Sequence, residues 1–349
     1  KQLKKHFIDV LGLAELEKNT YTGFYTTVTN FSSDLMGFDN LQAGALRPWE
    51  GTGSYYEEPH LASFLGRVNY TYDDRYVLTV NARTDASSKF GANHKWGFFP
   101  SVSAAWNVSN EQFMKQITWI DNLKLRLGYG LAGNQGGIDS YTTMNLVRPN
   151  GVAPVGNSPV VTYETLRNIN PDLKWEVKHT FNAGFDVGFY GNRLLLSVNY
   201  YNSKTTDMLY NYRVSVPPFT YNTLLANIGS MRNSGTEISV GITPLKTKDM
   251  ELNINANITF QKNKLLSLNG MYNGEYISAS EYTVIAGLDG AGFHGGYNNI
   301  VYQIVGQPLG VFYLPHCTGL VPDGNGGYKY EIADLNGGGD FMSESSVYL

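Results

Sequence analysis

The sequence contains a single cysteine, Cys317, so no disulfide bond can form within the chain. It also lacks a basic excess, because 26 lysine and arginine residues stand against 30 aspartate and glutamate residues. A protein that binds a nucleic-acid backbone neutralises phosphates with basic side chains, so this balance argues against nucleic acid as a partner. No run of apolar residues approaches the roughly 18 that a membrane-spanning helix requires.

Signatures of the common enzyme classes are absent as well. The sequence contains neither G-x-S-x-G, which positions a nucleophilic serine, nor H-E-x-x-H, which binds catalytic zinc. Residues 128–133 and 290–295 fit G-x-G-x-x-G, but the first match is followed by Asn-Gln-Gly-Gly, where a dinucleotide site needs a helix. In a chain with 38 glycines we interpret both matches as accidental. We predict no enzymatic activity, and no cofactor except the calcium ion considered below.

Aromatic residues are abundant, with 25 tyrosines, 17 phenylalanines and 5 tryptophans, whereas charged residues make up only 16% of the chain. Amphipathic aromatic side chains favour β-strands, and they gather at membrane–water boundaries. The composition therefore indicates a β-rich protein and directs attention to strands as the elements that would cross a membrane.

Apolar and polar residues alternate over long segments. In residues 75–106, Tyr76, Leu78 and Val80 fall on one side of the chain, and Thr79 and Asn81 fall on the other. A period of two predicts β-strands with two different faces. The pattern predicts about nine strands of roughly 10 to 15 residues. The other predicted strands lie within residues 10–16, 62–72, 123–134, 180–190, 193–203, 236–242 and 251–261.

The lengths of these strands and of their connections point to a barrel. Ordinary strands average about five or six residues, whereas a tilted strand that crosses a bilayer needs about 9 to 11. Short turns are expected at residues 73–74, 191–192 and 247–249. Long connections alternate with them, at residues 19–60, 86–96, 134–173, 211–234 and 264–296. Residues 109–122, predicted to hold a short helix, are the exception.

Outer-membrane barrels have short periplasmic turns and long extracellular loops. The predicted fold class is therefore all-β, a transmembrane antiparallel β-barrel whose apolar faces contact lipid and whose polar faces line the interior. Tyr70, Tyr72 and Tyr76 would form part of an aromatic girdle. Pattern alone leaves two alternatives open. One is a soluble β-rich carbohydrate-binding or hydrolytic domain with a dry core on the apolar face, and the other is a passive porin.

Six blocks of the sequence resemble, in the same order, the barrel of the SusC/RagA family of TonB-dependent outer-membrane transporters. The first block, residues 64–115, runs from FLGRVNYTYDDRYVLTVNARTDASSKF to NVSNEQFMK. The others are LKLRLGYGLAGNQ (123–135), NPDLKWE (170–176), NRLLLSVNYYNSKTTDML (192–209), NIGSMRNSGTEISV (227–240) and GQPLGVFY (306–313). The resemblance covers most of the chain.

The resemblance implies a plugged barrel of about 22 strands, in which residues 1–349 form part of a single outer-membrane β-barrel domain. The plug domain, the segment that engages TonB and the final strands are then expected outside this sequence. The family imports glycans or peptides across the outer membrane of Gram-negative cells, usually with a SusD-like surface lipoprotein. The implied partners are that lipoprotein, TonB through the missing N-terminal region, outer-membrane lipid, and an oligosaccharide or peptide substrate.

Aromatic residues on the predicted long loops are the candidate substrate-binding residues, because aromatic faces stack on sugar rings or hold apolar peptide side chains. They are Trp49, Tyr55, Tyr56, Trp96, Phe219, Tyr221, Tyr276, Tyr282, Phe293, His294 and Tyr297. The alternative is that these rings pack the loops together or meet the partner lipoprotein. On the polar face, Arg67, Arg83 and Arg126 are predicted to pair with carboxylates of the plug.

Residues 334–345, DLNGGGDFMSES, follow the opening of a calcium-binding loop. Asp334, Asn336 and Asp340 are the candidate ligands. The third acidic ligand is replaced by Gly338, and Glu344 comes one position early for the bidentate role. Because a hard cation depends on the number of oxygen ligands, the sequence predicts at most weak calcium binding, and a plain glycine-rich turn is the alternative.

Overall fold

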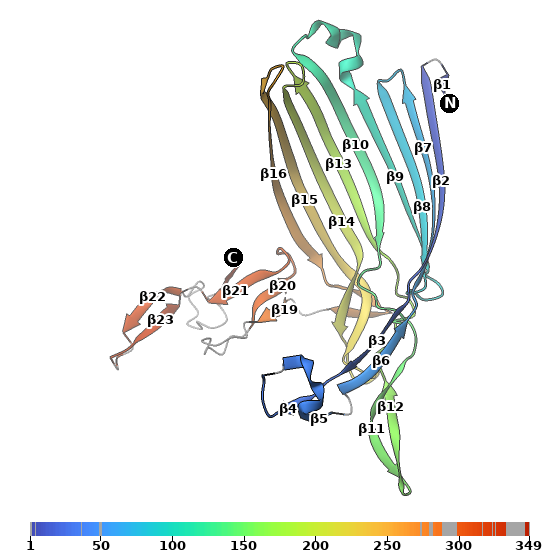
Figure 1. Ribbon diagram of the computed structural model, residues 1–349, viewed down its shortest axis with the longest axis vertical. Helices are drawn as coiled ribbons and strands as arrows, with labels where there is room; N and C mark the ends of the chain where they lie inside the picture. Colours follow the sequence, from blue (N-terminus) through green and yellow to red (C-terminus); the bar gives the residue numbers. More distant parts are fainter. Residues whose placement is uncertain are drawn as a thin grey trace.

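One antiparallel sheet of ten strands dominates the structure (Figure 1). The computed structural model describes residues 2–3, 5–35, 37–48, 51–272, 274–278, 282–287, 299–315, 317–322, 324, 326–332 and 346–348. The sheet contains a two-residue strand, β1 (Gln2–Leu3), and nine long strands. In their order of pairing, the long strands are β2 (His6–Lys18), β7 (His60–Tyr72), β8 (Tyr76–Ser87), β9 (Trp96–Asn107), β10 (Ile120–Asn134), β13 (Glu176–Phe189), β14 (Leu194–Arg213), β15 (Thr223–Lys246) and β16 (Glu251–Ser267).

The long strands lie side by side in one curved wall, which we call the wall below (Figure 1). Their lengths range from 12 residues in β8 and β9 to 24 residues in β15. All of them exceed the roughly 9 to 11 residues with which a tilted strand crosses a bilayer. The predicted all-β fold and its nine long antiparallel strands are confirmed.

The two faces of the wall carry different side chains, because the register keeps residues of one kind in line. A row across β2, β7, β8 and β9 consists of Val10, Val68, Val80 and Val102. The adjacent row, on the opposite face, consists of Asp9, Asn69, Thr79 and Ser103. The four valines are 44–71% exposed. A soluble sheet would cover such a row with a core, so this exposure contradicts the soluble alternative.

The connections divide between the two ends of the wall (Figure 1). At the short-turn end, residues 73–75, 190–193 and 247–250 join neighbouring strands. The connection 108–119 lies at the same end and contains two 3-10 helices, η4 (Val108–Asn110) and η5 (Gln112–Gln116). The long-loop end carries residues 19–59, 88–95, 135–175 and 214–222. The predicted alternation is confirmed, and its predicted exception folds into 3-10 turns.

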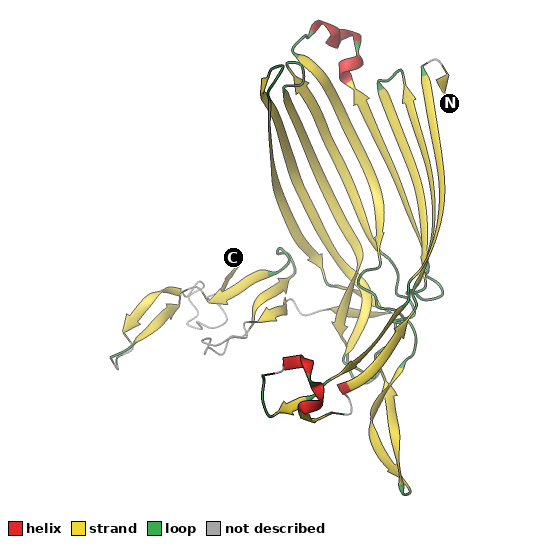
Figure 2. Ribbon diagram, in the orientation of Figure 1, coloured by secondary structure: helices red, strands yellow, loops and turns green. Residues whose placement is uncertain are grey.

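Two of the long connections are themselves folded into hairpins. Residues 19–59 contain β3 (Tyr21–Thr26) paired with β6 (Thr52–Glu57), and β4 (Thr29–Phe31) paired with β5 (Gly44–Leu46). Residues 135–175 contain the hairpin of β11 (Val147–Val155) and β12 (Ser158–Thr165). Figure 2 shows that helix is confined to short segments, which include η1 (Gly37–Asp39) and η2 (Leu41–Ala43). Within the described part of the chain, no helix has the length and apolar character needed to cross a membrane.

The predicted long loop at 211–234 is wrong in its bounds. Strands β14 and β15 continue to Arg213 and from Thr223, so only residues 214–222 connect them. Their pairing shifts register around Met208. The period-two pattern had already ended at the polar run SKTTD (203–207), and a bulge reverses the alternation of the side chains that follow it.

Beyond β16 the chain forms smaller sheets. A hairpin consists of β17 (Asn269–Tyr272) and β18 (Glu275–Ser278). A second sheet consists of β19 (Tyr282–Gly287), β20 (Asn299–Ile304), β21 (Val311–Pro315) and β24 (Ser346–Tyr348). Another hairpin pairs β22 (Cys317–Pro322) with β23 (Tyr328–Ile332). The backbone of Leu265 in β16 exchanges two hydrogen bonds with residues 306 and 307, which ties this region to the wall.

Buried apolar side chains gather at the long-loop end. One cluster consists of Phe90, Phe99, Ile138, Leu173 and Trp175. The Trp175 ring lies 4.7 Å from that of Phe90 and 5.5 Å from that of Phe99, measured between centroids. A second cluster consists of Tyr212, Leu224, Ala226 and Ile277. These clusters pack the long connections against one another and make the long-loop end of the wall rigid.

Candidate functional site

The polar face of the wall carries ion pairs, one between neighbouring strands and one within a strand. Arg126 on β10 donates two hydrogen bonds to Asp186 on β13, at 2.8 and 2.9 Å, and Ser197 on β14 donates a third at 2.6 Å. Arg83 donates to both oxygens of Asp85 at 2.9 Å. Arg83 and Arg126 thus find carboxylate partners within the wall itself, whereas Arg67 donates to the Asn81 side-chain oxygen at 2.7 Å. Pairing of these arginines with carboxylates of the plug stays a prediction.

Aromatic rings gather on the apolar face at the short-turn end. The rings of Tyr72 and Tyr76 are stacked with centroids 6.5 Å apart, and those of Tyr76 and Trp106 are 6.2 Å apart. Trp119 stacks on Phe189 at 5.7 Å. The predicted girdle beside the turn at residues 73–74 is present and extends beyond the three tyrosines that the sequence indicated. Amphipathic rings in this position suit a membrane–water boundary.

Two strands of the long-loop end form a platform of tyrosines. In the β3–β6 hairpin, Tyr25 lies opposite Gly53, and Tyr55 lies opposite Gly23. A Cβ atom on either glycine would approach the facing ring to 2.6 Å, so each ring lies across the bare backbone of the partner strand. By alternation Tyr21 shares this face. All three side chains are 53% exposed.

A single carboxylate fastens the base of this hairpin. Glu58, between β6 and β7, accepts hydrogen bonds from the Tyr56 hydroxyl at 2.6 Å and from His60 Nε2 at 3.1 Å, and it pairs with Lys18 Nζ at 2.9 Å. The Tyr56 hydrogen bond and the Lys18 ammonium lower the pKa of Glu58 from 4.5 to about 2. The backbone amide of Glu58 also donates to the Tyr141 hydroxyl at 3.0 Å. The hairpin is thereby held against both the wall and the loop after β10.

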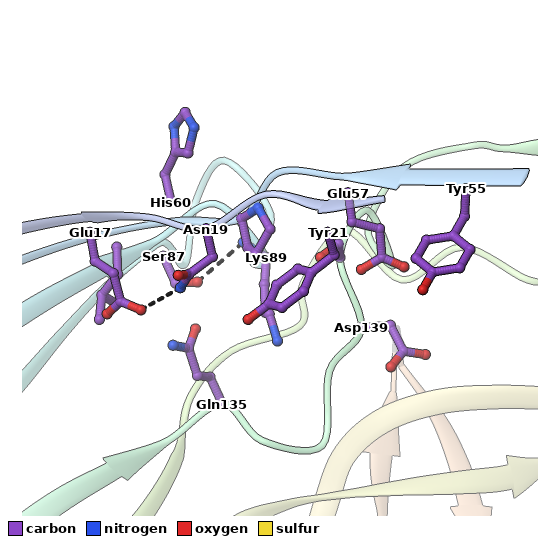
Figure 3. A pocket seen from close by; sticks show the side chains of 13 residues that line it. Glu17, Asn19, Tyr21, Tyr55, Glu57, His60, Ser87, Lys89, Gln135 and Asp139 are labelled. Carbon is purple, nitrogen blue, oxygen red and sulfur yellow. Dashed lines mark hydrogen bonds between the residues drawn. The ribbon is translucent and has the colours of Figure 1, made fainter. Parts of the chain in front are cut away.

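A pocket of about 490 Å³ opens between this hairpin, the wall and the loop after β10. We call it the rim pocket. Figure 3 shows Tyr21, Tyr55 and Glu57 along one side, with Gln135 and Asp139 across from them and Lys89 between. The 13 residues that line it are Glu17, Asn19, Tyr21, Tyr55, Glu57, Pro59, His60, Leu61, Ser87, Lys89, Gln135, Asp139 and Ser140. The register places Glu17, Leu61 and Ser87 in one row of the polar face.

The structure separates the aromatic residues that the sequence suggested. Tyr55 lines the rim pocket, whereas Tyr56 lies on the other face of β6 and is bound to Glu58. Trp96 lies on the apolar face, where its ring stacks on Phe64 with centroids 6.2 Å apart. These three residues therefore do not form one surface.

The remaining candidates divide between loop packing and the part of the chain outside the description. Phe219 packs against the second apolar cluster, and Tyr221 donates its hydroxyl to the carbonyl of Thr165. Tyr276 is exposed on β18, and of Tyr282 only the backbone position in β19 is described. Outside the described residues lie Trp49, Phe293, His294, Tyr297, Asp334, Asn336 and Asp340.

Sequence reasoning missed most of the rim pocket. Glu17, Glu57, Lys89, Gln135 and Asp139 come from four separate segments, and nothing in their spacing signals that they meet. Tyr21 could have been found, because TYTGFYT is rich in aromatic residues and threonine, which favour strands. In the described part of the chain, no group of three or more histidine, cysteine or acidic side chains is arranged to hold a metal ion.

Comparison with known proteins gives one consistent result. A family model described as TonB dependent receptor-like, beta-barrel matches residues 7–341. The chain is 33% identical over 363 residues to TonB-dependent receptor P26 of Formosa agariphila, covering 99% of this chain and 34% of that protein. It is 34% identical over 247 residues to TonB-dependent receptor SusC of Bacteroides thetaiotaomicron, covering 65% of this chain and 24% of SusC. The chain thus spans about a third or less of these relatives.

Solved structures show the same fold. The chain matches a structure of the RagAB peptide transporter with a TM-score of 0.67 and 23% identity, covering 99% of this chain and 36% of that one. It matches the closed-closed state of the RagAB peptide importer with a TM-score of 0.69, again at 23% identity, covering 100% and 36%. At this level of identity the likeness concerns the path of the backbone.

Proposed function

Because the chain belongs to the family of TonB-dependent receptor-like β-barrels, we propose that it forms part of the wall of an outer-membrane transporter that imports an oligomeric nutrient, a glycan or a peptide. SusC and the RagAB peptide transporter, to which the chain is similar, support this class of activity. The proposal assigns no chemical step to the protein, since the family is one of receptors and transporters. The apolar face of the wall would contact the lipid of the outer membrane.

The observation that carries this proposal is the two-faced wall. Most of the exposed valines, leucines and phenylalanines of the long strands occupy one face, with stacked aromatic rings at the short-turn end. The opposite face carries hydrogen-bonded and ion-paired polar residues such as Arg126 and Asp186. An apolar band faces lipid at no cost, whereas buried polar groups need partners or water. Such a wall suits a barrel with a polar interior.

Two partners belong to the same proposal. TonB would supply energy through a region outside this sequence, and a SusD-like surface lipoprotein would deliver the substrate to the long-loop end. Large folded connections at one end only, such as 19–59 and 135–175, support this orientation, because outer-membrane barrels carry their long loops outside the cell. The short-turn end would then face the periplasm.

Deletion of the gene in its source organism tests the transport proposal. We expect the deletion strain to lose growth on one class of oligomer, glycan or peptide, supplied at limiting concentration as sole carbon source. The full-length gene product should restore growth, and a protonophore should abolish uptake of the labelled oligomer. Monosaccharides and free amino acids are the control, since they do not need this route.

Two results would contradict the proposal. Unchanged growth of the deletion strain on every oligomer tested would remove the import function. Uptake that persists after the protonophore is added would indicate a passive pore, in which diffusion rather than TonB moves the substrate.

A further inference from the structure

We propose that the rim pocket binds an uncharged oligosaccharide and excludes acidic ones. This inference rests on the proposed import function, and it names the chemical class of the substrate. The pocket offers about 490 Å³ at the end of the wall where substrate would enter, which is within the usual range for small-ligand sites.

The charges of the pocket set the first condition on its ligand. Three carboxylates, those of Glu17, Glu57 and Asp139, line it together with one lysine, Lys89. The Lys89 ammonium donates to the backbone carbonyl of Ile138 at 2.8 Å, so part of its hydrogen-bonding capacity is taken up by the loop after β10. A uronic acid or sulfated sugar would therefore approach an excess of negative charge, and like charges at short range disfavour binding.

The same carboxylates suit the hydroxyl groups of a neutral sugar. Among the residues that the structure describes, the side chains of Glu57 and Asp139 have no hydrogen-bond or ion-pair partner. Both are free to accept hydrogen bonds, and ionised acceptors form stronger hydrogen bonds than neutral ones. Asn19, Gln135, Ser87 and Ser140 add further polar groups around the same space. Hydroxyl groups on several sides of a pyranose ring can use such a lining.

The tyrosine platform sets the second condition. Tyr21, Tyr55 and Tyr25 occupy successive positions on one face of the β3–β6 hairpin, each two residues from the next, which is about 6.6 Å along a strand. The rings of Tyr55 and Tyr25 lie across glycine backbone, Tyr21 lies opposite Glu57, and all three side chains are about half exposed. The C–H face of a sugar ring stacks on such aromatic faces. A linear oligosaccharide can thus run along the platform, with one end in the rim pocket.

A peptide fits this lining less well. Only Pro59 and Leu61 contribute aliphatic side chains to the pocket, so an apolar peptide side chain finds little surface to cover it. A peptide rich in lysine or arginine is the competing ligand, because it would pair with the three carboxylates. The experiment therefore includes such a peptide.

Binding to the full-length protein in detergent tests the inference. Calorimetric titration with neutral hexaoses of gluco-, xylo- and manno-configuration is compared with hexagalacturonate and a lysine-rich hexapeptide. We expect at least one neutral hexaose to bind, and Tyr55→Ala to weaken it by about tenfold. Phe24→Ala is the matched control, since Phe24 lies on the opposite face of the same hairpin and is 86% exposed. It should leave the affinity unchanged.

A second variant tests the role of charge. The double variant Glu57→Gln with Asp139→Asn keeps acceptors in place but removes two negative charges. We expect the loss for the neutral hexaose to stay within about threefold, and binding of hexagalacturonate to become measurable. A purely structural role of these residues would not change selectivity in this way.

The results of the binding experiment can be distinguished from those of the transport experiment. Binding of hexagalacturonate or of the basic peptide by the unmodified protein, with no neutral hexaose bound, overturns the inference. So does equal loss of affinity in the Tyr55→Ala and Phe24→Ala variants. In both cases a deletion strain that still fails to grow on an oligomer would leave the import function standing.

Discussion

Among single residues, Glu111 connects several side chains of the short-turn end. Its carboxylate accepts hydrogen bonds from the Tyr76 hydroxyl at 2.8 Å and the Trp106 indole at 3.1 Å, and it pairs with Arg75 at 3.1 Å. These contacts hold the pKa of Glu111 below its ordinary value of 4.5. A carboxyl group whose pKa falls on folding stabilises the fold above its ordinary pKa, and this contribution is lost as the pH drops through the lowered value.

The Glu111→Gln variant should therefore show a weaker pH dependence of stability. As the pH is lowered from about 7 to about 3, we expect the unfolding temperature of the full-length protein to fall. The unfolding temperature of the variant should fall less over the same range. The amide keeps an acceptor for Tyr76 but has no charge to be neutralised. The unfolding temperature of both proteins is measured by their heat-modifiable migration in gel electrophoresis. Parallel pH profiles of the two proteins would contradict a stabilising role of the Glu111 carboxylate.

Gly91 shows how closely the loops at the opposite end are packed. A Cβ atom at this position would lie 1.9 Å from the carbonyl oxygen of Pro171. Because backbone cannot move aside as a side chain can, Gly91→Ala should separate the loops 88–95 and 166–175 and cost about 1–3 kcal/mol.

Gly66→Ala is the control for Gly91→Ala, since a Cβ atom there meets nothing within 4 Å. Limited proteolysis of the full-length protein measures the effect. Cleavage within residues 166–175 should accelerate in the first variant only. Equal cleavage in both would show that the loops adjust without loss.

Residue roles were only partly predictable from the sequence. Trp96 was placed among substrate contacts because it ends the predicted long loop 86–96, yet its parity with Phe98 in β9 sets it on the apolar face. Tyr221 was unpredictable, because its hydroxyl is taken up by the carbonyl of Thr165, 56 residues away in the chain. A pattern of neighbours along one strand carries no information about such distant contacts.

At the scale of the strand, β9 gives a direct test of what its faces contact. Val102 and Ser103 are consecutive residues and point to opposite faces. Val102→Arg in the full-length protein should cost about 2–4 kcal/mol if this position lies near the bilayer midplane, whereas Ser103→Arg should cost less because the polar face is wet.

Chemical unfolding of both β9 variants in lipid vesicles, followed by tryptophan fluorescence, gives the comparison. Val102→Leu serves as the control for side-chain size on the apolar face. A larger loss of stability for Ser103→Arg than for Val102→Arg would contradict the assignment of the Val102 face to lipid and of the Ser103 face to the interior.

Elements with uninterrupted alternation were the predictable ones. Strands β7 to β10 were expected almost to the residue, because valines, leucines and aromatic residues recur at every second position. The continuation of β14 past residue 203 was hidden by the polar run 203–207 and by the bulge that follows it. The β11–β12 hairpin was assigned to a loop, since its prolines and glycine read as turn signals although its strands pair with each other.

For the whole molecule, the two lateral edges of the sheet decide how the chain behaves alone. In the described part, β16 pairs only with β15, and β2 has beyond β7 only the two-residue strand β1. Unpaired strand edges recruit other strands. We expect the isolated 349-residue chain, refolded in detergent, to elute as oligomers, and the full-length protein to elute as a smaller, defined species.

Size-exclusion chromatography with light scattering measures the mass of each species. A monodisperse monomer of the isolated chain would show that its edges are protected without further strands. Lysine substitutions along the free edge of β16 offer a second test, since charge on an edge strand discourages pairing and should shift the isolated chain toward smaller species.

The architecture of the whole wall was accessible from the sequence, because nine long strands follow each other without a crossover. The packing of the long-loop end was not accessible from the sequence, since its apolar clusters assemble from segments as distant as Phe90 and Trp175. Burial there depends on which loops meet, and only the folded chain determines that.

The pairing of each long strand with its immediate successor has a consequence for biogenesis. Each hairpin whose turn lies at the short-turn end closes a short stretch of chain, so the entropy lost in forming that hairpin stays small. The wall can accordingly grow by the addition of one hairpin after another to its edge strand. An insertion machinery that feeds in successive hairpins would then need no rearrangement of the portion already laid down.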